Sequence, residues 1–218
     1  WQNQQSCKNR DSGPDFHYAS PWNIEAKHIH PILTQTVIPR PVAWVLSQNP
    51  GDDYNLAPYS FFTVVTGKPP ILMVSVGKKP SDGSFKDTRV NIEARKQFVV
   101  HIGNRSQAQA MTESSRHLDH GQSELDRLDM KLVQEEGWPM PRVEGCLVAL
   151  YCELREVIEM GDTPQSLVFG NIKKVFVDDQ IWLTLGRACV RHDGQEDCHE
   201  GISLEEENSH QSDGSDPI

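Results

Sequence analysis

The chain has 218 residues and a formal net charge of −10, with 31 acidic residues against 21 lysines and arginines. This length suits one domain, or at most two, with a sizeable buried core. The acidic balance argues against a protein that holds nucleic acid through its phosphate backbone. Eight of the acidic residues, and no lysine or arginine, follow Gln195, so the C-terminal segment carries −8 of the charge.

No apolar run reaches the ~18 residues of a membrane-spanning helix, and the first residues lack the apolar core of a signal peptide. The five cysteines are odd in number and scattered, which favours a reducing compartment over a disulfide framework. We therefore expect a soluble cytoplasmic protein without membrane contact. Cys146 and Cys152 lie on one expected strand, about 20 Å apart, and are expected to be unbridged core residues.

The first half of the chain predicts an arm followed by strands. Residues 1–27 are polar, with early glycine and proline residues, and predict an N-terminal arm. Apolar patterns predict a strand over residues 41–47 and another over 55–65, joined as a β-hairpin by a loop rich in turn residues. The continuous apolar run over residues 71–76 suits a strand buried on both faces.

A short helix is expected from Asp87 to Gln97, because the segment begins with helix-start residues and continues with helix formers. The polar segment 105–137 predicts one or two surface helices. Further strands are expected over residues 98–102, 146–160, 165–177 and 180–185. The pattern predicts a mainly β domain over residues 28–186, a closed antiparallel barrel with helical insertions. Residues 187–218 lose all periodicity and predict a disordered acidic tail.

The sequence SFKDT, Ser84 to Thr88, opens the expected helix. A helix start offers unpaired backbone N–H groups and a positive dipole end. With Lys86 and the hydroxyls of Ser84 and Thr88, it has the donors and the cation that a phosphate monoester needs. The alternative is that Asp87 or Thr88 only caps the helix.

The strand NLAPYSFF, Asn55 to Phe62, holds small and polar residues inside an apolar run. Small side chains at Ala57 and Ser60 would let a flat isoalloxazine ring approach the backbone, with an aromatic residue covering one face. The alternative is a buried strand whose polar groups are satisfied internally.

In IPRPVAW, residues 38–44, Pro39 and Pro41 fix the backbone around Arg40, which suits capture of a phosphate or carboxylate. Trp44 on the following strand would line a ring site. The alternatives are a surface arginine and a core tryptophan.

The segments PRPVAWVLS, NLAPYSFF, PPILMVSV and KDT with a following Asn91-Ile92 resemble, in this order and spacing, the flavin reductase-like family. This is the FMN-binding split-barrel group that includes flavoredoxins and the flavin-reducing components of two-component monooxygenases. The resemblance covers roughly residues 29–185. It implies a six-stranded antiparallel split β-barrel, FMN held without covalent linkage, and a homodimer with the flavin sites near the interface.

The resemblance also implies cofactor-binding residues. The strand residues would contact the isoalloxazine ring and its edge, and the residues at the helix start would contact the ribityl chain and the phosphate. The matching positions here are Arg40, Trp44, Asn55, Ser60, Phe61, Lys86, Asp87 and Thr88. No side chain is expected to act as a catalytic nucleophile or base, because the flavin carries the chemistry.

The leading hypothesis is an FMN-dependent oxidoreductase in which NAD(P)H passes a hydride to the flavin, which reduces a further acceptor. The family's Gly-Asp-His segment, whose histidine lies near the nicotinamide, reads here Gly161-Asp162-Thr163-Pro164, and the chain departs from the family pattern again after Leu185. These departures favour an alternative, an FMN-binding electron carrier without its own NAD(P)H reaction. A third hypothesis is a split barrel that binds another cofactor, such as haem or a deazaflavin, or none.

Metal binding is not expected. The histidines of RHLDH, residues 116–120, and the group His192, Cys198 and His199 lack compact zinc spacing.

Overall fold

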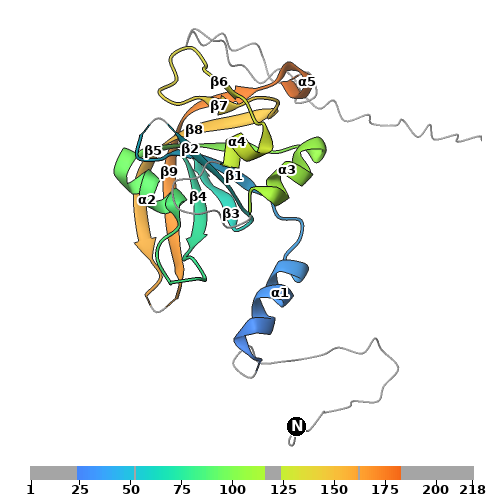
Figure 1. The fold of residues 1–218 in the computed structure, drawn as a ribbon, viewed down its shortest axis with the longest axis vertical. Coiled ribbons are helices and arrows are strands. Elements are labelled where there is room, and N and C mark those ends of the chain that lie inside the picture. The colour runs from blue at the N-terminus through green and yellow to red at the C-terminus, as the bar shows by residue number, and fades with distance from the viewer. Residues whose placement is uncertain (1–23, 52, 116–123, 162, 183–218) are drawn as a thin grey trace, which may run out of the picture.

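The computed structural model describes residues 24–51, 53–115, 124–161 and 163–182. Its main feature is a seven-stranded antiparallel sheet in the order β2-β1-β5-β8-β9-β4-β3 (Figure 1). The strands of this sheet are β1 (Ala43–Gln48), β2 (Tyr54–Tyr59), β3 (Phe62–Gly67), β4 (Pro70–Gly77), β5 (Gln97–Ile102), β8 (Val148–Glu159) and β9 (Gln165–Val177). A small sheet pairs β6 (Leu132–Val133) with β7 (Arg142–Val143). The helices are α1 (Ala26–Thr36), α2 (Asp87–Arg95), α3 (Ala108–Glu113), α4 (Glu124–Leu128) and α5 (Asp179–Trp182).

The expected single strand over residues 55–65 is in fact two strands at opposite edges of the sheet. β2 pairs with β1, whereas β3 pairs with β4 across a bulge between Val64 and Thr66. Each segment is an edge strand that pairs on one side with a different neighbour, and the two are separated by Ser60 and Phe61. The expectation of six strands in a closed barrel is corrected to seven strands in a sheet whose edges, β2 and β3, are not hydrogen-bonded to each other.

The connection between β2 and β3 requires the sheet to roll up. Ser60 and Phe61 alone lie between the last residue of β2 and the first of β3. Three Cα–Cα steps span at most about 11 Å, so the two edges of a seven-stranded sheet must come within that distance. The result is a barrel that is split between its edge strands.

Strand β1 separates two hydrophobic cores. Ala43 and Val45 point into the barrel, where they pack in a cluster that includes Phe98. Trp44 and Leu46 point the other way, into a cluster that takes Leu125 from α4 and Met140 from the segment between the two short strands. This alternation explains why β1 is buried on both faces.

The helix α2 lies close to β1 and β2 and buries Ile92 in the barrel core. The prediction of a helix from Asp87 is confirmed, and the helix ends two residues earlier than expected. Lys96 takes a left-handed conformation with a φ of 62°, and its N–H donates to the carbonyl of Ile92. This turn stops the helix and leads directly into β5.

The sequence did not predict α1, which begins at Ala26, inside the expected arm of residues 1–27, and continues beyond it. The helix extends away from the sheet in Figure 1. Four apolar side chains in the C-terminal half of α1 and just after it are exposed to solvent. The most exposed of them is Ile38, with an exposed fraction of 68%. None of the helices in the described ranges is both long and apolar enough to cross a bilayer.

The strand expected over residues 180–185 is wrong in its described part, since residues 179–182 form α5 instead. Asp178 explains the difference, because its carboxylate accepts the N–H of Gln180 at 3.0 Å and so supports a helical turn. The strands expected over residues 98–102, 146–160 and 165–177 are confirmed within a few residues, and two short helices occur within 105–137. The buried, unbridged state expected for Cys146 and Cys152 is confirmed.

Several predictions fall outside the described residues. They concern most of the N-terminal arm, the RHLDH stretch, the segment after Leu185, the group around His192 and the acidic tail. Within the described ranges, no cluster of three or more His, Cys, Asp or Glu side chains is placed to hold a metal ion.

Gly170 provides a test of the barrel core. A Cβ atom added there would lie 2.5 Å from Cζ of Phe98, which is fully buried. We expect Gly170→Ala to lower the free energy of unfolding by about 1–3 kcal/mol through overpacking. Urea denaturation measures this change. The control is Gly67→Ala, because a Cβ atom added at Gly67 has no other atom within 4 Å. Equal stability of the two variants would contradict the packing described.

His101 on β5 is fully buried and joins three elements. The Val143 N–H donates to its Nε2 at 2.9 Å, so Nδ1 carries the ring proton and donates to the Trp44 carbonyl at 3.0 Å. Burial, with a smaller contribution from the charge of Arg142, lowers the pKa of His101 from 6.5 to about 4, against the opposing hydrogen bond to Trp44. A charged ring would lose the acceptor that Val143 uses.

This arrangement predicts acid sensitivity. Above pH 6.5 His101 is neutral in both states, whereas between 6.5 and about 4 only the unfolded chain takes up the proton. We expect the wild type to lose roughly 2–3 kcal/mol more stability than His101→Gln between pH 7 and 4.5. Urea titrations of both proteins across this range measure the difference. If the stability of the two proteins fell in parallel with pH, His101 would not be the source of the acid sensitivity.

Candidate functional site

Thr88 in the first turn of α2 joins the helix to strand β2. Its Oγ1 accepts hydrogen bonds from Nδ2 of Asn55 at 2.8 Å and from the hydroxyl of Tyr59 at 2.9 Å. Thr88 is 1% exposed, so these bonds form away from water. The start of α2 is therefore fixed against the end of β2 by a buried polar contact.

The same polar layer continues under α2. Asn91 donates through Nδ2 to Asn49 Oδ1 at 2.8 Å and to Ser47 Oγ at 3.2 Å, and Asn55 lies 3.5 Å from the same serine hydroxyl. Asn55 thus holds Thr88 and α2 through hydrogen bonds inside the protein. This agrees with the alternative stated for its strand, a buried strand whose polar groups are satisfied internally. Its contact with a flavin ring stays a prediction.

Lys86 occupies the N-cap position of α2, rather than Asp87 or Thr88, and provides no side-chain cap. Its side chain is half-buried, Nζ lies 5.4 Å from the ring centroid of Tyr59, and burial lowers the pKa of the amine. The neighbouring Asp87 pairs with Lys79 at 2.9 Å. Within the described ranges Lys86 forms no ion pair, and its N-cap position lies at the positive end of the helix dipole, which does not offset its charge.

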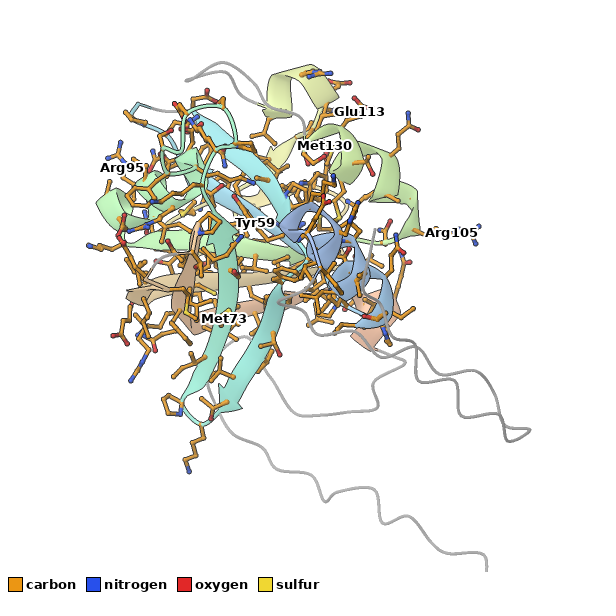
Figure 2. The ribbon with its side chains drawn as sticks, turned by 90° about the horizontal axis from the view of Figure 1, so that it is seen from below. Tyr59, Met73, Arg95, Arg105, Glu113 and Met130 are labelled. Atoms are coloured by element: carbon orange, nitrogen blue, oxygen red, sulfur yellow. The ribbon has the colours of Figure 1, made fainter. Side chains whose placement is uncertain are left out.

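Ser60 and Phe61 form the link between the sheet edges, beside Tyr59. The carbonyl of Phe61 accepts the N–H of Ser75 at 2.8 Å, which holds the link against β4. The Phe61 ring is half-buried and lies edge-on to His30 of α1, with 5.8 Å between ring centroids. In Figure 2 Tyr59 lies near the centre of the view, whereas Arg95 and Arg105 lie at its margins.

Arg40 lies between Phe61 and the C-terminal end of α1. Its guanidinium is 5.8 Å from the ring centroid, and Nη1 donates to the carbonyls of Thr34 at 2.6 Å and Val37 at 2.7 Å. It therefore closes the last turn of α1. Its Nε is buried and has no hydrogen-bond partner in the described part of the protein.

Trp44 does not join this cluster. It is fully buried in the core beside α3, and its indole N–H donates to the hydroxyl of Ser114 at 2.9 Å. The structure thus brings together seven of the eight expected residues in one continuous neighbourhood and places Trp44 on the opposite face of β1.

Two residues of this neighbourhood were not predicted from the sequence. Tyr59 connects Thr88 with Lys86, and its only sequence signal was a polar group inside an apolar strand. Arg89 is 4% exposed behind the helix start, and its only signal was the spacing of four residues to Glu93.

Comparisons with known proteins agree with this geometry. A family model described as flavin reductase like domain matches residues 35–185. The uncharacterized protein YwrF of Bacillus subtilis is 31% identical over 163 residues, 73% of this chain and 78% of that protein. The crystal structure of nitrilotriacetate monooxygenase component B from Bacillus cereus has a TM-score of 0.71 at 30% identity and covers 77% of this chain and 84% of that one.

A third comparison concerns the fold alone. A putative flavin reductase with a split barrel domain from Shewanella frigidimarina superposes with a TM-score of 0.66 at 18% identity, covering 84% of this chain and 86% of that one. The resemblance inferred from the sequence motifs is therefore confirmed, and so is the split-barrel architecture.

Proposed function

Since the chain belongs to the flavin reductase-like family, we propose that it is an oxidoreductase that binds FMN without a covalent bond in the neighbourhood of Lys86 and Phe61. The similarity to a monooxygenase component supports a role in flavin-dependent electron transfer. FMN is favoured over riboflavin because the proposed site includes a cation at a helix start.

The observation that carries this proposal is the uncompensated charge of Lys86. A half-buried ammonium loses hydration, and among the described residues only the Tyr59 ring, and no carboxylate, offsets the charge of Lys86; a bound anion would supply the missing counter-charge. It stands at the N-terminus of a nine-residue helix whose N-cap provides no side-chain acceptor. A cation together with helix N–H groups is the donor set that suits a phosphate monoester.

The chain's own residues would bind and orient the cofactor, while the flavin supplies the redox chemistry when bound. Lys86 and the first turn of α2 would hold the phosphate. The hydroxyl of Ser60, which has no hydrogen-bond partner among the described residues, would donate to the polar edge of the ring. Phe61 would exclude water from one side, and the Asn55–Thr88–Tyr59 contacts would keep the two halves of the site in register.

A second copy of the chain is the proposed partner. Exposed apolar side chains at α1 and on the edge strand β3 support this, including Ile38 at 68% and Val64 at 57%. Both elements adjoin the link at Ser60 and Phe61, so a dimer through them would bring the partner close to the cofactor.

Lys86→Met tests the phosphate assignment. We expect the dissociation constant for FMN to rise about 10- to 100-fold, because a charge-assisted hydrogen bond is lost. The constant for riboflavin, which lacks the phosphate, should barely change. Quenching of flavin fluorescence measures both. Lys173→Met removes the same charge from the exposed surface of β9 and serves as the control. An equal loss for FMN and riboflavin would contradict the assignment.

Oxidation of NAD(P)H decides between the reductase and the electron carrier. The segment from Gly161 to Pro164, at the β8–β9 turn, lacks the family's histidine, which favours the carrier as the second candidate. For the reductase, we expect NADH or NADPH to bleach the visible absorbance of the FMN-loaded protein without oxygen. Absorbance that persists with both nucleotides but bleaches with dithionite would contradict the reductase and support the carrier.

A further inference from the structure

Arg89 is a buried charged residue that the proposed cofactor contacts do not use. Its guanidinium carbon lies 3.6 Å from the ring centroid of Phe85, so the two groups are stacked. Nη1 donates to Ser166 Oγ at 2.5 Å, and Nη2 donates to Glu159 Oε1 at 2.8 Å. Glu93, one turn further along α2, accepts from Nε at 3.3 Å. Every N–H-bearing atom of the guanidinium is thus engaged.

These contacts tie the helix start to a distant hairpin. Glu159 is the last residue of β8, and Ser166 lies at the start of β9, where the two are direct partners in the sheet register. Arg89 therefore binds both members of one facing residue pair of β8 and β9, about seventy positions away in the chain. Phe85 immediately precedes Lys86, so the stacked ring carries this restraint to the residue beside the proposed phosphate ligand.

The other end of the same loop is restrained as well. The N–H of Lys78 donates to the Pro164 carbonyl at 3.0 Å, and the N–H of Lys79 donates to the Ser84 carbonyl at 2.7 Å. The hydrogen bond between Lys79 and Ser84 thus closes the loop of residues 78–86, and the one from Lys78 joins this loop to the β8–β9 turn. Among the described residues, Arg89 is the only residue of α2 that reaches the β8–β9 hairpin through hydrogen bonds or an ion pair.

We propose that Arg89 is a positioning residue that sets Lys86 and the first turn of α2 in the geometry required for the cofactor's phosphate. This inference rests on the proposed binding of FMN. Lysine cannot replace arginine in this role, because it has neither a planar fork for two acceptors nor a face that stacks on Phe85. A gain in stability is a weaker explanation for the buried charge, since buried ion pairs contribute little net stabilisation over apolar residues.

The partner Glu159 provides a second approach to the same contact. Its side chain is 60% exposed, so its replacement does not endanger the core. The hydrogen bond from Arg89 lowers the pKa of this carboxyl group, so Glu159 stays ionised at a lower pH than an isolated glutamate does. Glu153 on the same strand is 50% exposed and pairs with Lys173 at 3.1 Å. It forms no hydrogen bond or ion pair with α2 in the described part of the chain, and so offers a matched control.

The measured quantity is the ratio of the dissociation constants for riboflavin and FMN, which isolates the phosphate contribution. We expect Arg89→Lys to lower this ratio roughly fivefold or more, because misaligned hydrogen bonds to the phosphate are weakened while riboflavin binding is kept. Glu159→Gln should lower it in the same direction, and Glu153→Gln should leave it at the wild-type value. Thermal unfolding of each variant is recorded beside the titrations.

The outcomes separate this inference from the proposed function. A wild-type protein that binds FMN no better than riboflavin would overturn the phosphate assignment and this inference with it. A wild type that prefers FMN, with Arg89→Lys and Glu159→Gln keeping the wild-type ratio, would overturn the role of Arg89 alone. A lowered melting temperature with an unchanged ratio would also overturn it, because a purely structural residue gives that result.

Discussion

The shortness of the link between β2 and β3 is the constraint on which the rest of the structure depends. Two residues, Ser60 and Phe61, connect strands that lie at opposite edges of a seven-stranded sheet. The sheet can satisfy this connection only by rolling until its edges meet, and the right-handed twist of antiparallel sheets allows it to do so. The link then lies at the split of the barrel, next to the start of α2. The location of the candidate site is thus a result of chain geometry before any cofactor is considered.

Polar groups inside the domain keep the rolled sheet and its helices in one arrangement. Thr88 accepts from both Asn55 and Tyr59, and His101 connects β1 with β7, so the donors of these two contacts have defined acceptors. Such contacts add little net stability but are costly to break, which fixes the relative positions of the elements. In the candidate site, Lys86 and Phe61 therefore lie on different elements whose relative position is fixed by the Asn55–Thr88–Tyr59 contacts.

Much of the fold could be predicted from local patterns, and the exceptions have a common cause. The continuous apolar run at β4 and the helix formers from Asp87 gave correct elements, because periodicity and helix-start residues act over a few positions. The division of residues 55–65 could not be predicted, since both halves read as strand and only their distant partners differ. Trp44 shows the same limit, because both faces of β1 are buried and the sequence does not say which face lies toward the candidate site. Arg89 acts through residues some seventy positions away, which no local pattern reveals.

The contact between Arg89 and the β8–β9 hairpin also bears on the order in which the protein is completed during synthesis. Every residue proposed to touch the cofactor has been translated once β5 has emerged from the ribosome, since the last of them is Thr88. Glu159 and Ser166 follow much later, and β9 also completes the sheet between β8 and β4. A nascent chain at the earlier stage therefore carries all the proposed FMN-binding residues, but lacks strand β9 and the contacts that Arg89 makes with Glu159 and Ser166. On the proposed assignment, tight binding of FMN would await a chain whose barrel is complete.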